Sequence, residues 1–210
     1  MTQIVAPKLT ACLDRLEMPE RMVLADDFDL GEMEETACAS SWSFGGIRRP
    51  PETNNYVKFW LTDEGATVLY VDDPIIGVRY VLVNGKKTDK TRRDIKRTVR
   101  LLSRAAVIAE AEKARGFTQS ARAGRRLLTV AGDRYDARIF ALLRDKFFCH
   151  RDARIRADMI TCFAYAGWKQ LRPLLQQRAD EDKDAEIRKF AQTALDAWDA
   201  EKAGKLIAPP

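Results

Sequence analysis

Histidine is almost absent from this chain, and its scarcity limits the chemistry that the protein can perform. His150 is the single histidine among 210 residues, so few side chains have an ordinary pKa near neutrality for general acid–base catalysis. The four cysteines, Cys12, Cys38, Cys149 and Cys162, have no CxxC spacing, and His150 does not complete a convincing zinc set with them. We expect buried thiols rather than a metal site.

The chain also lacks the motifs of the common enzyme classes. It contains no Gly-rich phosphate loop, nucleophile elbow or HExxH motif. The stretch "LADDFDLGE" gathers Asp26, Asp27, Asp29 and Glu32, which could chelate a divalent cation, but the spacing is not that of an EF-hand loop. A solvated acidic loop is the simpler interpretation. We expect a non-enzymatic protein without cofactor or metal.

Long apolar runs are missing as well. No run approaches the ~20 apolar residues of a membrane helix, and the start "MTQIVAPKLT" lacks the basic-then-apolar order of a signal peptide. We therefore expect a cytoplasmic protein with no membrane partner. The hydrophobic fraction of 46% is enough for a folded core.

The net charge of +5 hides a strong asymmetry along the chain. Residues 1–85 carry 7 basic and 14 acidic side chains, residues 86–156 carry 21 and 8, and residues 157–210 carry 8 and 9. A strongly basic middle segment indicates an acidic partner, nucleic acid above all. The partner could also be the acidic front end of the same chain.

The spacing of apolar residues predicts a mainly α fold with a small antiparallel β meander. Short helices are expected near Leu9–Leu16 and Met33–Ser40, before "SFGGIRRPPE" breaks the pattern. Apolar alternation in "YVKFWLT", "ATVLYV" and "VRYVLV" then predicts three strands joined by tight turns. We divide the chain into an acidic helical N-terminal segment (1–50), a three-stranded meander (51–86), a long basic helix (87–119) and helical repeats (120–210).

The basic segment is predicted to be one long helix capped at Thr88, because no helix breaker occurs before Gly116. Its apolar stripe runs from Ile95 through Val99 to Ala109. The arginines lie ~200° from this stripe on the helix, and only one acid, Asp94, interrupts the positive charges between Lys90 and Arg104. Either this is an ordinary solvated helix face or it binds an acidic partner.

Two segments near the C-terminus repeat one another. "DARIRADMIT" begins at Asp152 and "DAEIRKFAQT" at Asp184, with a degenerate third copy in phase at Ser120. A regular period lets stacked helix pairs bury apolar faces that one pair cannot bury alone. The positions expected in that core are Leu127, Met159 and Ala191 in one register and Val130, Cys162 and Ala194 in another.

The two clear copies resemble HEAT repeats of the short bacterial type, whose second helix commonly opens with Asp, two variable residues, an aliphatic residue and Arg. Here these are Asp152, Ile155 and Arg156, then Asp184, Ile187 and Arg188. The resemblance implies a C-terminal HEAT-like α-solenoid over residues 120–210. The Asp is placed to cap its helix, and Arg156 and Arg188 can reach an Asp of a neighbouring repeat.

Solenoids of this kind are mostly binding surfaces. We expect the chain to hold nucleic acid, DNA or RNA, mainly through phosphate contacts on a basic helical face. No motif for reading base sequence is visible. The expected binding residues are Lys90, Arg93, Arg97, Arg100, Arg104, Arg122, Arg125 and Arg126.

Two alternatives stay open. The same face could bind an acidic protein, as an adaptor, inhibitor or immunity-type factor would. Some HEAT-like proteins are DNA glycosylases that pair aromatic residues with an acid, and Tyr165, Trp168 and Asp158 could form a similar arrangement.

The acidic front end offers a further hypothesis. "LADDFDLGEMEE" could cover part of the arginine face as an internal mimic of the partner and lower its affinity. The alternative is that the two sets of charges are solvated on separate faces.

Overall fold

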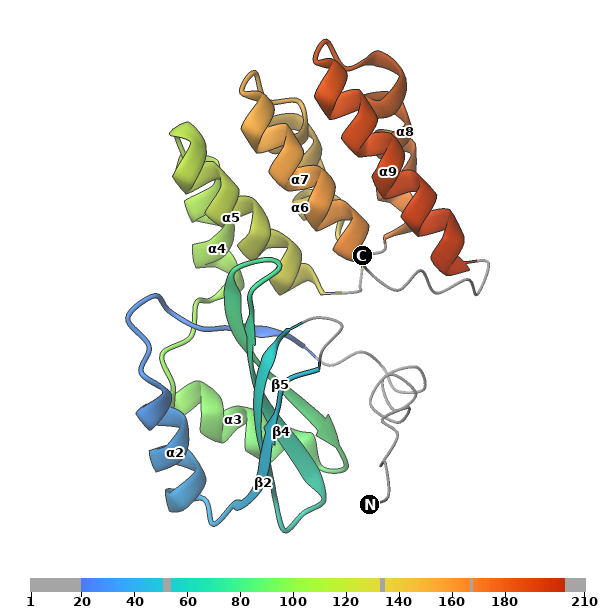
Figure 1. The fold of residues 1–210 in the computed structure, drawn as a ribbon. Helices are drawn as coiled ribbons and strands as arrows, with labels where there is room; N and C mark the ends of the chain where they lie inside the picture. The colour runs from blue at the N-terminus through green and yellow to red at the C-terminus, as the bar shows by residue number, and fades with distance from the viewer. Residues whose placement is uncertain (1–19, 51–53, 133–134, 167, 203–210) are drawn as a thin grey trace.

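The computed structural model describes residues 20–50, 54–132, 135–166 and 168–202. In these residues the fold is mixed, with eight α-helices and one five-stranded antiparallel sheet. The expectation of a mainly helical chain with a β meander is therefore confirmed. The helix predicted at Leu9–Leu16 lies outside the described residues. Figure 1 shows the sheet with helices α2 (Leu30–Ala39) and α3 (Thr88–Thr98) at one end of the molecule, and paired helices beyond it.

The sheet is larger than predicted. Its strand order is β1-β5-β4-β3-β2, so the three predicted strands form the antiparallel meander β3-β4-β5 and two more flank it. Both extra strands come from the first fifty residues, which are therefore not only helical. The strands are β1 (Met22–Val23), β2 (Ser43–Arg48), β3 (Tyr56–Leu61), β4 (Ala66–Asp73) and β5 (Val78–Gly85).

Strand β2 occupies the stretch that was predicted to be a break. Gly45 and Gly46 suggested a turn, but they lie in an edge strand that pairs with β3 and carries a register shift between Phe44 and Gly46. A Cβ at Gly45 would lie 2.3 Å from a ring carbon of Phe59. Glycine at this position therefore allows the strand to approach the Phe59 ring closely.

Each face of the sheet packs against helices. Trp60, Val68 and Val81 share one face and form a core with Met33 of α2 and Ile95 of α3. On the opposite face, strand residues including Val57, Val71 and Tyr80 belong to the core that continues through the paired helices. The sheet therefore connects the basic helix α3 on one face to the helical repeats on the other.

The predicted single basic helix is wrong, because the chain breaks between α3 and α4 (Arg104–Lys113). The predicted cap is also wrong, because the N-cap of α3 is Lys87 and Thr88 is the first helical residue. Leu101 forms a β-bridge with Leu24, and backbone hydrogen bonds join Arg100 to Ala25 and Leu102 to Val23. Ser103 then caps α4 by accepting a hydrogen bond from the Ala106 amide. Long-range pairing with β1 and a new N-cap together outweigh the local helix propensity of this segment.

The break changes which residues are buried. Ile95 and Val99 of the predicted stripe are buried, but Ala106 is exposed. In α4 the buried side chains are instead Val107, Ile108 and Ala111, because the helix restarts in a different phase.

The remaining helices follow in three antiparallel pairs, seen side by side in Figure 1. The second helix of each pair contacts that of the next, α5 against α7 and α7 against α9. Five of the six predicted core positions are confirmed, because Leu127, Met159 and Ala191 are fully buried and Cys162 and Ala194 are buried. The sixth, Val130, is only partly buried against this core. The helices of these pairs are α4 with α5 (Gly116–Ala131), α6 (Ala137–Leu142) and the π-helical η1 (Leu143–Phe148) with α7 (Ala153–Ala166), and the short 3-10 helix η2 (Lys169–Leu171) and α8 (Arg172–Glu181) with α9 (Ala185–Lys202).

The repeated Asp and Arg residues make mostly the predicted contacts. Asp152 and Asp184 each accept a hydrogen bond from the backbone amide two residues later, at 3.0 and 2.9 Å. Arg156 reaches Asp182 of the following helix pair. Arg188 instead donates to the backbone carbonyl of Asp182 in its own pair, at 2.6 Å. None of the helices described is both long enough and apolar enough to span a bilayer.

Candidate nucleic-acid interface

Helix α3 presents a basic surface. Thr91 and Ile95 bury its inner side against the sheet, which turns the opposite side toward solvent. Three of the predicted binding residues, Lys90, Arg93 and Arg97, are exposed there. The exposed charged residues from the turn before α3 to its last turn are six cations and one acid, namely Lys86, Lys87, Lys90, Arg93, Lys96 and Arg97 with Asp89.

These cations are only lightly neutralised. Lys90 pairs with Glu64 and Lys96 with Glu20, each at 3.1 Å. Arg97 pairs with Asp94, but its own side chain is 76% exposed. Arg93 makes no ion pair with any residue that the structure describes. Ion pairs at such exposed positions contribute about 0–1 kcal/mol, so these side chains are free to exchange partners.

Arg100, two residues beyond α3, is engaged by the acidic N-terminal loop. Its guanidinium pairs with Asp27 at 2.5 Å and with Glu32, whose carboxylate also accepts from the Arg100 backbone amide at 3.1 Å. Glu32 is held from a second side, because it completes the capping box of α2 with Asp29. The hydrogen bond from Arg100 lowers the pKa of Glu32 from 4.5 to about 2.

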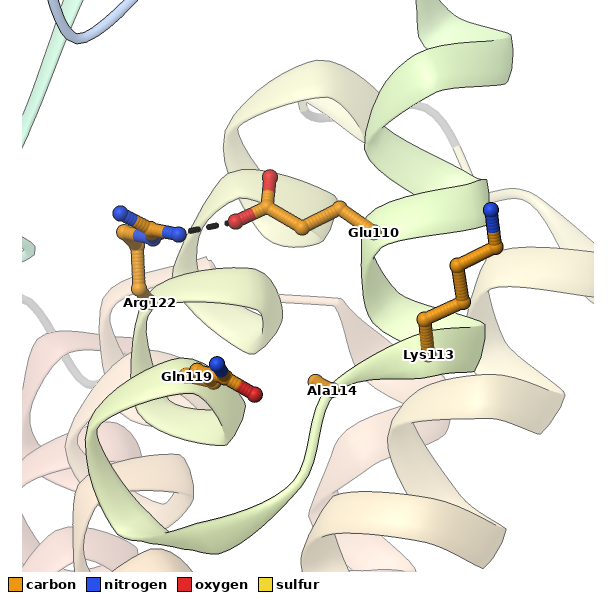
Figure 2. Close-up of a pocket in the computed structure, with 5 residues that line it drawn as sticks. All are labelled: Glu110, Lys113, Ala114, Gln119 and Arg122. Atoms are coloured by element: carbon orange, nitrogen blue, oxygen red, sulfur yellow. Dashed lines mark hydrogen bonds and ion pairs between the residues drawn. The ribbon is translucent and has the colours of Figure 1, made fainter.

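Arg122 and Arg126 of α5 meet acids from two directions. Asp26 of the β1–α2 loop pairs with both, at 3.2 Å to Arg122. Glu110 of α4 also pairs with both, at 3.0 Å and 2.8 Å. Figure 2 shows Arg122 and Glu110 joined across an open depression between α4 and α5. Arg126 is 8% exposed, so it is a structural residue rather than a surface cation.

The other two predicted arginines join helix pairs. Arg104 pairs with Asp136, the N-cap of α6. Arg125 pairs with Asp158 of α7, which raises the pKa of Arg125, and it lies close to the Ile76 carbonyl of the β4–β5 turn. Both contacts are long-range and stabilise the packing of neighbouring elements.

The eight predicted residues therefore do not form one continuous basic surface. Lys90, Arg93 and Arg97 remain on an open face. Five arginines, Arg100, Arg104, Arg122, Arg125 and Arg126, are paired with acids from other elements. We call the set Arg100, Arg122, Arg126, Asp26, Asp27, Glu32 and Glu110 the junction cluster; its formal charge is −1, from three arginines and four acids.

Sequence reasoning missed three cations of the α3 face, Lys86, Lys87 and Lys96.

The residues considered for a glycosylase-like site have structural contacts. Trp168 is buried, and its indole nitrogen donates to the Gly132 carbonyl at 2.8 Å. Asp158 accepts from Arg125. The side chain of Tyr165 lies outside the described part of the structure.

The acids considered for cation binding are likewise engaged by protein groups. Asp26, Asp27 and Glu32 pair with arginines, and Asp29 caps α2. Within the described residues, no group of three or more potential ligand side chains is arranged to hold a metal ion.

Comparison with known proteins gives no family for this arrangement: no protein-family model, curated protein or solved structure matches the chain.

Proposed function

We propose that the protein is a non-enzymatic module that holds nucleic acid through phosphate contacts made by the exposed face of α3. The observation that carries the proposal is the set of six cations against one acid on that face. Lys and Arg side chains that neutralise phosphates supply most of the affinity in sequence-independent binding. Asn and Gln, which commonly read base edges, do not occur in α3.

We further propose that the three helix pairs form a short HEAT-like solenoid that supports this interface. Support comes from the contacts of α5 with α7 and of α7 with α9, and from the buried repeat positions Leu127, Met159 and Ala191. In such a stack each pair contacts its neighbours and presents an extended surface. The sheet, which packs on both α3 and the helix pairs, would hold α3 in a fixed position relative to the stack.

The test is titration of a fluorescently labelled DNA duplex by anisotropy at about 50 mM and about 200 mM salt. Binding should weaken steeply with salt because counterions are released from the duplex. Arg93→Glu with Arg97→Glu should lower affinity at least about tenfold and reduce the salt slope by about 2. Absence of binding by the wild type at the lower salt concentration would overturn the proposal.

A matched control separates the α3 face from net charge. Lys183→Glu with Lys189→Glu changes the charge by the same amount at exposed positions of the last helix pair. This control should bind like the wild type. Equal loss in both double variants would show that general charge, and not the α3 face, determines the affinity.

One observation favours the second candidate, an adaptor or inhibitor that binds an acidic protein. Arg122 and Arg126 already receive a carboxylate from a polypeptide loop, at Asp26. Pull-down with nuclease treatment distinguishes the two functions. A stoichiometric protein partner that survives the nuclease and is lost in the Arg93→Glu, Arg97→Glu variant would favour the adaptor.

A further inference from the structure

The junction cluster contains carboxylates that are held firmly and carboxylates that are not. Glu32 accepts from the side chain and the backbone of Arg100 and caps α2. Glu110 is 24% exposed and bridges two arginines. Asp26 and Asp27, in contrast, have side chains that are 63% and 71% exposed. Their ion pairs are open to water and are individually weak.

The backbone that carries these two aspartates is fixed. Phe28 is buried, and Arg79 donates to the backbone carbonyl of Asp26 at 2.9 Å. The Ala25 amide donates to the Arg100 carbonyl at 3.0 Å. The loop therefore stays in place when Asp26 and Asp27 change rotamer, and only two side chains need to move.

We propose that Arg100 and Arg122, whose side chains are each 49% exposed, form a second phosphate site, which Asp27 and Asp26 occupy in the free protein and a nucleic-acid phosphate takes over on binding. The inference rests on the proposed function, because it concerns the same nucleic acid. Guanidinium groups pair with carboxylate and phosphate oxygens in the same forked geometry. Without the carboxylates of Asp26 and Asp27, the three arginines and two glutamates of the cluster have a formal charge of +1.

Two features of the surroundings suit a phosphate. Arg122 borders the open depression between α4 and α5, and Lys113 lies on the opposite wall of that depression in Figure 2. Lys113 makes no ion pair with the described residues. Arg100 lies two residues beyond the end of α3, so the second site is close in sequence to the proposed α3 interface.

The experiment compares duplex affinity in four proteins at one salt concentration. Asp26→Asn with Asp27→Asn should raise affinity about threefold to tenfold over the wild type, because two competing carboxylates are removed. The matched control is Asp145→Asn with Asp199→Asn, which removes two exposed aspartates paired with Arg144 and Arg172. The control should give less than about twofold change. An equal gain in both would reduce the effect to net charge and overturn the proposal.

The fourth protein adds Arg122→Ala to Asp26→Asn and Asp27→Asn. It should lose the gain, because the released arginine is then absent, and retention of the gain would contradict the proposal. Circular dichroism checks that each variant is folded. If the Asp26 change unfolds the protein, Asp27→Asn alone should still raise affinity, because Asp27 contacts Arg100 at the exposed end of the cluster.

The outcomes also separate this inference from the proposed function. If the wild type does not bind the duplex but the Asp26→Asn, Asp27→Asn variant does, the α3 face is not a sufficient interface and the second site is supported. Binding that depends on Arg93 and Arg97 but is unchanged in the aspartate variant would retain the α3 face and reject the second site.

Discussion

Arg156 and Asp182 form a buried bidentate ion pair between the second and third helix pairs. Nε and Nη2 of Arg156 each donate to one carboxylate oxygen of Asp182 at 2.8 Å, and the two side chains are 3% and 0% exposed. Burial, which raises the pKa of Asp182, is outweighed by the hydrogen bonds from Arg156 and from the Asp184 amide, and the pKa falls below its usual value. The pair joins successive helix pairs through a polar contact inside the core.

Removing Arg156 should be costly because the buried Asp182 carboxylate then keeps only the longer contact with Arg178, at 3.3 Å, as an ion pair. Arg156→Met is expected to lower the free energy of unfolding by at least about 2 kcal/mol, measured by urea denaturation. Arg172→Met is the control, since its pair with Asp199 is 37% and 52% exposed and contributes about 0–1 kcal/mol. Similar losses of unfolding free energy in the two variants would contradict the larger contribution of the buried ion pair.

The hydrogen bond from Arg100 to Glu32, together with the capping box, should make stability depend on acid pH. The pKa of Glu32 is lowered in the folded state from 4.5 to about 2, so its contribution is complete above pH 4.5 and declines as the pH falls toward 2. Glu32→Gln should therefore be less stable than the wild type at neutral pH. Thermal denaturation across the acid range should show the two proteins converging at about pH 2, and a constant difference would be inconsistent with this role.

Gly85 is expected to tolerate no side chain. Its φ is +105°, and a Cβ there would lie 2.4 Å from the Gly65 carbonyl oxygen, which is backbone and cannot move aside. Gly85→Ala should lower the free energy of unfolding by about 2–3 kcal/mol. Gly31→Ala in α2 meets only ordinary contacts at 3.5 Å or more and should be neutral or stabilising by up to about 1 kcal/mol. Chemical denaturation of both variants checks the difference.

The cysteines should differ in reactivity. The expectation of buried thiols is wrong for Cys38 and Cys149, which are exposed, and correct for Cys162, whose pKa burial raises to about 12. At about pH 8, iodoacetamide should modify Cys38 and Cys149 and spare Cys162 until denaturant is added. Peptide mass spectrometry identifies the modified residues. Rapid labelling of Cys162 under native conditions would indicate that the helix pairs open.

Local patterns predicted the elements whose partners are near in sequence. The alternation from Tyr56 gave β3, β4 and β5, and the repeat gave the buried positions at Leu127, Met159 and Ala191. The strands follow from an alternation of two residues and the helix pairs from a repeat of thirty-two residues, and both periods can be counted in the sequence.

Features that depend on distant partners were not predictable. The helix from Thr88 lacks a local breaker, and its interruption at Leu101 depends on Leu24, which is 77 residues away. Arg126 resembles a surface cation by its spacing, yet Asp26 pairs with it from 100 residues away. The hypothesis that the acidic N-terminal segment lies against the arginines is correct for the contact of Asp26 with Arg126. It did not predict that the same segment contains strands β1 and β2.

The bridge between Leu24 and Leu101 also has a consequence for the order of folding. Strand β1 is held by β5 on one side, through Met22 and Val23, and by the segment Arg100–Leu102 on the other. Although it is synthesised early, β1 cannot complete its pairing until residue 102 has left the ribosome. Contacts at such sequence separation close slowly, so we expect the meander to form first and β1 to dock late, joining sheet and helix pairs in one of the last steps of folding.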